Sequence, residues 1–145
     1  MPTPLQDLET IQRARATVLN RARWPVGYHL VVAAMGGGLV AAMALPDPLP
    51  SMAASLVAIG SVLLANWSRS RLGFFVNGWR WGRTLWVSMI TLAVLLGGVT
   101  LSILRQRLDL PDWTPFAAGA VVFVCVFFTG RLWERVYRAE LASAA

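Results

Sequence analysis

The chain contains no lysine, one cysteine and one histidine among its 145 residues. The single thiol, Cys125, excludes an internal disulfide and any metal site built from several cysteines. The single imidazole, His29, excludes multi-histidine zinc sites and bis-histidine haem. The basic residues are all arginine, a bias that a GC-rich genome produces without any functional cause. We therefore expect neither a metal nor a cofactor.

Charged residues are scarce. They make up 14% of the chain, whereas 57% of the residues are hydrophobic. A soluble globular domain has about a quarter of its residues charged, so this composition argues against one. The net charge of +6 suits either nucleic acid or anionic lipid. Because the apolar runs are long, we expect anionic membrane lipids as partners and no nucleic acid.

Acidic residues are too few and too scattered to predict an active site. No Asp, Glu, Arg or Lys lies inside the long apolar runs, where charged groups mark proton and ion paths. Proton-coupled transport is therefore not expected, and neither is an enzyme. The seven acids do not converge at a helical spacing; they are Asp7, Glu9, Asp47, Asp109, Asp112, Glu134 and Glu140.

Four apolar runs dominate the sequence. A helix of about 20 residues crosses the roughly 30 Å hydrocarbon core of a bilayer, and a surface helix of a soluble protein would show charges along one face. None of the runs contains Asp, Glu, Arg or Lys. The pattern predicts an all-α polytopic membrane protein, a four-transmembrane-helix bundle with spans at 26–45, 51–67, 84–104 and 113–130.

The distribution of arginine predicts the orientation of this bundle. With four crossings, the N-terminal segment, the link 68–83 and the tail 131–145 lie on one side, and eleven arginines lie in these three segments. Only Arg105 and Arg107 lie on the other side, close to Asp109 and Asp112. Cytoplasmic loops are enriched in arginine. We therefore expect a protein of the cell inner membrane, with residues 1–145 forming one membrane domain and both termini cytoplasmic.

The segment 1–24 has the pattern of an amphipathic helix. Thr3, Pro4 and Gln6 suit a helix start with a capping box, and apolar residues recur after it at spacings of three, four or seven. Such a helix lies on the membrane surface, or it docks onto a partner or a second copy of the chain.

The link between the second and third spans, "RSRLGFFVNGWRWGR", combines arginines with aromatic residues. Its glycines lack the spacing of a nucleotide-binding loop, and Asn77-Gly78 is typical of a turn. The aromatic rings suit the headgroup region, and the guanidinium groups suit lipid phosphates. We consider two interpretations, an ordinary cytoplasmic link or a lipid- or partner-binding surface. The residues of that surface are Arg69, Arg71, Arg80, Arg83, Trp79, Trp81, Phe74 and Phe75.

Small residues recur on the apolar runs at spacings that let helices approach closely. The packing partner is either another span of the same chain or a second copy, which would make the protein part of a homo-oligomer or a larger membrane complex. The residues expected in this packing are Gly37, Gly38, Ala41 and Gly97. In the first span, we expect His29 to make a satisfied hydrogen bond near the interface rather than to act as a ligand or a proton switch.

The segments "RARWPVGYHL" and "GFFVNGWRWGRTLW" resemble corresponding parts of small uncharacterised four-span integral membrane proteins of high-GC bacteria. The resemblance implies the same layout of spans and transfers no functional residue. From the residues, we expect a non-enzymatic accessory or interaction protein that binds anionic lipid or a membrane partner through its cytoplasmic face. The alternatives are a small oligomeric carrier or channel for an apolar or amphipathic solute, and a membrane-embedded regulator of a cytoplasmic protein.

Overall fold

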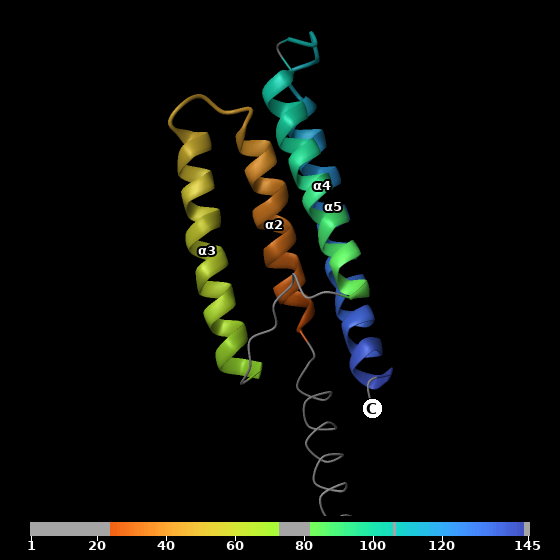
Figure 1. Cartoon of the computed structure of the whole chain (residues 1–145). Helices are drawn as coiled ribbons and strands as arrows, with labels where there is room; N and C mark the ends of the chain where they lie inside the picture. The colour runs from red at the N-terminus through yellow and green to blue at the C-terminus, as the bar shows by residue number, and fades with distance from the viewer. Residues whose placement is uncertain (1–23, 73–81, 106, 144–145) are drawn as a thin grey trace, which may run out of the picture.

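The computed structural model describes residues 24–72, 82–105 and 107–143. Within these ranges the chain forms four α-helices, α2 (Val26–Ala42), α3 (Leu49–Leu72), α4 (Arg83–Leu104) and α5 (Thr114–Ser143). The helices alternate in direction, so that the α2–α3 and α4–α5 links lie at one end of the bundle and the C-terminus lies at the other (Figure 1). The expected all-α architecture is thus confirmed for the described residues. The amphipathic helix expected at 1–24 lies almost wholly outside them.

Three of the helices are long and apolar enough to cross a membrane, namely α3, α4 and α5. The remaining helix, α2, is apolar but has only 17 residues. It ends at Ala42, three residues before the expected end of the first span. Beyond it, the N–H groups of Met43, Ala44 and Leu45 bond to the carbonyl three residues back, which closes a tight turn before Pro46.

Two helices extend beyond their expected ends. α3 begins at Leu49 rather than at 51, because the proline at its second position fits the first turn of a helix. It continues to Leu72, five residues beyond the expected end at 67. Arg69 and Arg71 lie in its last turn, where positive charge interacts favourably with the helix dipole. The link expected at 68–83 is correspondingly shorter.

The largest difference concerns α5. We expected its span to end at Gly130 and a tail to follow, but the helix continues without interruption to Ser143. The continuation packs against the rest of the bundle. The ring of Tyr137 is buried against Trp24, and Glu140 accepts a hydrogen bond from the backbone N–H of Arg83, at the first turn of α4.

The core lies where α2, α4 and α5 meet. Ala33, Val40, Val122 and Val126 form its buried centre, and residues of α4 pack around them. One turn after Ala33 along α2, the backbones of α2 and α5 come into contact. A Cβ atom built on Gly37 would lie 2.6 Å from the carbonyl oxygen of Gly119. Only glycine permits this approach on both helices.

The other small residues predicted to pack are divided between the core and the outer surface. Ala41 faces Gly119, because a Cβ atom on that glycine would lie 3.1 Å from the Ala41 Cβ. In contrast, a Cβ atom on Gly38 or Gly97 would meet nothing within 4 Å. Within the described chain, Gly37 and Ala41 therefore pack against α5, and the other two residues face outward.

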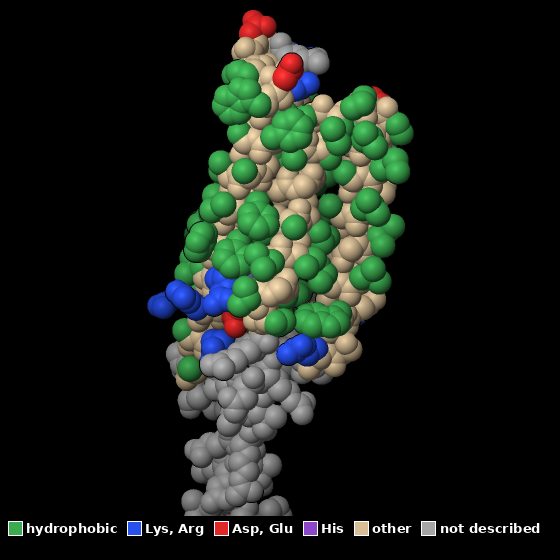
Figure 2. Space-filling view, turned by 180° about the vertical axis from the view of Figure 1, so that it is seen from behind, with side chains coloured by type: hydrophobic (Ala, Val, Ile, Leu, Met, Phe, Trp, Pro, Cys, Tyr) green, Lys and Arg blue, Asp and Glu red, His purple; other side chains and the backbone are tan. Residues whose placement is uncertain are grey.

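α3 lies at the edge of the bundle and packs mainly along α2 (Figure 1). None of its most apolar stretch is buried within the chain, and Leu56 and Leu63 are 68% and 63% exposed. Hydrophobic side chains cover the bundle along its length, whereas most of the visible basic side chains lie toward one end and the acidic side chains lie mainly at the other (Figure 2). A soluble monomer does not expose apolar surface on this scale.

Candidate functional site

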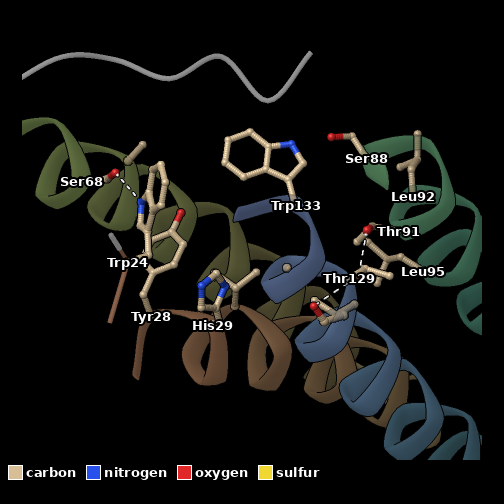
Figure 3. Close-up of a pocket in the computed structure, with 14 residues that line it drawn as sticks. Trp24, Tyr28, His29, Ser68, Ser88, Thr91, Leu92, Leu95, Thr129 and Trp133 are labelled. Atoms are coloured by element: carbon tan, nitrogen blue, oxygen red, sulfur yellow. Dashed lines mark hydrogen bonds between the residues drawn. The ribbon is translucent and has the colours of Figure 1, made fainter. Parts of the chain in front are cut away.

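A cavity of about 450 Å³ opens at the arginine-rich end of the bundle. All four helices line it. α2 and α5 contribute His29 and Trp133 to the lining, and α3 and α4 contribute Ser68 and Ser88 (Figure 3). The cavity exists because α3 packs along α2 without closing onto α4, so the two outer helices leave a partly open space between them.

Aromatic side chains close one wall of the cavity. Trp24 is buried, and its indole N–H donates a hydrogen bond to the Ser68 hydroxyl at 3.2 Å, which ties the start of α2 to α3. The edge of its ring packs on Trp133 with a centroid distance of 5.7 Å. Trp133 in turn stacks on Tyr137 at 5.2 Å. Each such pair contributes roughly 0.5–1.5 kcal/mol beyond the apolar area that it buries, so this wall is firmly held.

A second stack extends from the cavity toward its mouth. The ring of Tyr28 lies parallel to that of Trp67 on α3, with centroids 6.0 Å apart. The guanidinium of Arg71 lies over Trp67, 5.4 Å from the ring centroid. This cation–π contact connects a positive charge at the end of α3 with the aromatic lining of the cavity.

His29 lines the cavity and forms a buried polar pair with Glu134, which lies behind the lining. The His29 Nε2 atom lies 2.8 Å from Glu134 Oε2, and the side chains are only 6% and 13% exposed. The expected satisfied hydrogen bond of His29 is thus confirmed. Its partner comes from the part of α5 that we had expected to be a tail. Gly130 makes room for the ring, because a Cβ atom there would lie 3.0 Å from His29 Nδ1.

Hydroxyl groups line the opposite side. Thr91 donates a hydrogen bond to the Thr129 hydroxyl at 2.9 Å, and Thr129 donates to the carbonyl of Cys125 on its own helix. This bond joins α4 to α5 halfway along the cavity wall. Below it, Leu92, Leu95 and Val126 make the lining apolar. The cavity is therefore polar and aromatic near its mouth and aliphatic at depth.

The two ends of the bundle differ in charge. At the cavity end, the described arginines outnumber the acids, which are engaged with His29 and with the start of α4. At the other end, Arg105 pairs with Asp112 at 3.2 Å, and Asp47 and Asp109 lie in the same links. The described arginines at the cavity end are Arg69, Arg71, Arg83, Arg131, Arg135 and Arg138.

Of the surface predicted from the middle link, Arg69, Arg71 and Arg83 fall within the described residues, at the ends of α3 and α4. Arg80, Trp79, Trp81, Phe74 and Phe75 lie outside them. The three described arginines all lie at the end where the cavity opens.

Sequence reasoning missed the aromatic wall and the role of Glu134. The sequence signal that could have predicted this wall is the spacing of Trp133, Tyr137 and Glu140, because it places the three side chains on one face of a continuing helix. His29 and Glu134 also lie at the same end of an alternating bundle, one turn from the ends of the expected spans.

Among the described residues, no group of three or more His, Cys, Asp or Glu side chains could hold a metal ion. No protein-family model, no curated protein and no solved structure matches the chain. The function must therefore be argued from the cavity and its surroundings.

Proposed function

We propose that the chain is an integral membrane protein that binds an anionic amphiphilic lipid, whose headgroup meets the arginines and whose hydrocarbon part enters the cavity. The observation that supports this most directly is the position of the cavity. It opens at the end of the bundle where Arg69, Arg71 and Arg83 lie, and it becomes aliphatic with depth.

In this proposal the chain crosses the membrane four times, with α2 as the fourth span. A helix of 17 residues is about 26 Å long, and the apolar turn Met43–Leu45 adds to that length. The arginine-rich end is cytoplasmic, as the positive-inside rule predicts. Anionic lipid headgroups are then available at the mouth of the cavity, where guanidinium groups make charge-assisted hydrogen bonds to phosphate.

Binding of a lipid fits the cavity better than passage of a solute through the bundle. Beyond Leu95, the side chains of Val40, Val122 and Val99 fill the space between α2, α4 and α5. Because the cavity is closed at this end, it is suited to binding a ligand and not to passing a solute through the bundle. We therefore place the accessory role ahead of the carrier.

The test compares two charge-removing variants of the full-length chain in mild detergent. Arg71→Gln with Arg83→Gln removes two arginines at the cavity end, and Arg107→Gln removes one exposed arginine at the other end. Native mass spectrometry then measures the phosphatidylglycerol and phosphatidylcholine that each protein retains. We expect the wild type to prefer phosphatidylglycerol, the double variant to lose that preference several-fold, and Arg107→Gln to keep it.

Two outcomes would overturn the proposal. One is equal retention of the anionic and the zwitterionic lipid by the wild type. The other is an unchanged preference in the double variant, which would mean that the arginines at the mouth of the cavity do not select the lipid.

A further inference from the structure

Three hydrogen-bond donors around the cavity have no acceptor among the described residues. The Trp133 indole N–H is buried without a partner. Ser68 accepts a hydrogen bond from Trp24, and its own hydroxyl proton is left without an acceptor. The Tyr28 hydroxyl likewise has none. Of the three, only the Trp133 N–H is fully buried, and leaving it unpaired costs about 1–3 kcal/mol, so this end of the bundle favours a ligand that brings an acceptor.

The direction of these groups fits a shared ligand. In Figure 3 the indole nitrogen of Trp133 lies on the side of the ring that faces Ser88 and α4, and the Tyr28 hydroxyl points away from α2 into the space between α3 and α5. Ser68 faces the same space from α3. The donors thus belong to three different helices and surround one volume.

The acceptor that suits these donors is a neutral one. None of the three donors is charged, and no arginine lies in the lining of the cavity. The carboxylate of Glu134 lies just behind the lining, where it bonds to His29. A second anion at this depth would be repelled by that carboxylate, whereas a carbonyl oxygen accepts hydrogen bonds without adding charge.

The layers along α4 match the parts of a phospholipid. Arg83 lies at its first residue, Ser88 lies at the level of the donors, and Leu95 lies among the aliphatic residues below. At 1.5 Å per residue, the distance from Arg83 to Leu95 is about 18 Å. A phospholipid has its phosphate first, its two ester carbonyls below it and its acyl chains below those.

We propose that the cavity recognises the ester carbonyl groups of a diacyl phospholipid, and that the Trp133 indole N–H is the main donor to them. This inference rests on the proposed function, because the phosphate of the same lipid would meet the arginines at the mouth. It adds a chemical specificity that charge alone does not give. A lipid with the same headgroup and ether-linked chains has no carbonyl and leaves the donors unpaired.

The experiment compares matched lipids on the full-length protein. Diacyl phosphatidylglycerol and its dialkyl ether analogue, with equal chain lengths, compete for the protein in mild detergent, and native mass spectrometry measures the bound ratio. We expect the wild type to retain the ester lipid at least about fivefold better. Trp133→Phe keeps an aromatic ring against Tyr137 but removes the N–H, and its ester-to-ether ratio should fall close to one.

The control is Trp86→Phe, which removes an indole N–H from a side chain that is 74% exposed and does not line the cavity. Its ester-to-ether ratio should equal that of the wild type. If Trp133→Phe does not yield a folded protein, Tyr28→Phe combined with Ser68→Ala removes the other two donors and should lower the ratio in the same direction.

The outcomes separate this inference from the proposed function. Equal retention of the ester and ether lipids by the wild type would overturn ester recognition and leave anionic lipid binding intact. Retention of neither lipid would overturn both. An undiminished ester preference in Trp133→Phe and in the double variant would show that these donors do not contact the lipid.

Discussion

His29 and Glu134 show how a polar contact can exist in a bundle whose other described contacts are mostly apolar. The two residues are 105 positions apart in the chain, and their bond fixes the first turn of α2 against α5. A carboxylate only accepts hydrogen bonds, so His29 Nε2 must donate. Each side chain therefore depends on the other, because either one alone would be a polar group buried without its partner.

This dependence predicts unequal effects of single and double substitutions. His29→Ala leaves the Glu134 carboxylate buried and unpaired, which we expect to destabilise the protein by about 3 kcal/mol or more. His29→Phe combined with Glu134→Leu replaces both groups by apolar ones and should cost clearly less. The midpoint of thermal unfolding in detergent measures the difference. An equal loss in the two variants would show that the pair is not coupled.

At the scale of the helices, the glycines of α2 distinguish its packed face from its outer face. Gly37 faces the backbone of α5 so closely that an added methyl group requires the helices to separate. Gly38, its neighbour in sequence, has open space around its Cα. We expect Gly37→Ala to lower the stability by about 1–3 kcal/mol, the usual cost of overpacking.

The matched substitution Gly38→Ala should leave the stability unchanged or raise it by up to about 1 kcal/mol, because alanine is the better helix former. Thermal unfolding of the two variants side by side measures both effects. A loss in Gly38→Ala as large as that in Gly37→Ala would contradict the assignment of the two faces, and would favour packing of Gly38 against a second copy.

The helices were predictable from the sequence, but their ends were not. Uncharged apolar runs predict helices, and this pattern located α2 to α5. The end of α5 depends instead on contacts with distant residues, such as that of Tyr137 with Trp24 and that of Glu140 with the start of α4. The hydropathy of the sequence predicts that the span ends at Gly130, because a charged residue, Arg131, follows it. Hydropathy alone does not include the contacts with distant residues that continue the helix.

The candidate site was predictable only in part for the same reason. Because successive spans alternate in direction, the sequence predicts that the arginines at the end of α3 and the start of α4 lie at the same end of the bundle. The cavity follows from the position of α3, which packs along α2 and leaves a space beside α4. No periodicity within a single span determines which of two neighbours a helix will contact.

On the scale of the whole molecule, the cavity opens at the same end of the bundle where most of the described arginines lie. The cavity, the aromatic stacks and six of the eight described arginines lie at the end with the C-terminus, whereas Arg105 and Arg107 lie at the other end with Asp47, Asp109 and Asp112. If the arginine-rich end is cytoplasmic, the ligand enters from the inner leaflet. The orientation therefore determines which lipids can reach the site.

Labelling of introduced cysteines tests this orientation. In a Cys125→Ser background, Leu108→Cys places a thiol in the α4–α5 link, where the native side chain is 55% exposed, and Ala142→Cys places one at the exposed end of α5. With a membrane-impermeant maleimide, we expect intact cells to label only Leu108→Cys, and opened cells to label both, because the positive-inside rule keeps the arginine-rich end in the cytoplasm. Labelling of Ala142→Cys alone in intact cells would invert the topology. The cavity would then face the outer leaflet, and the lipid would have to come from there.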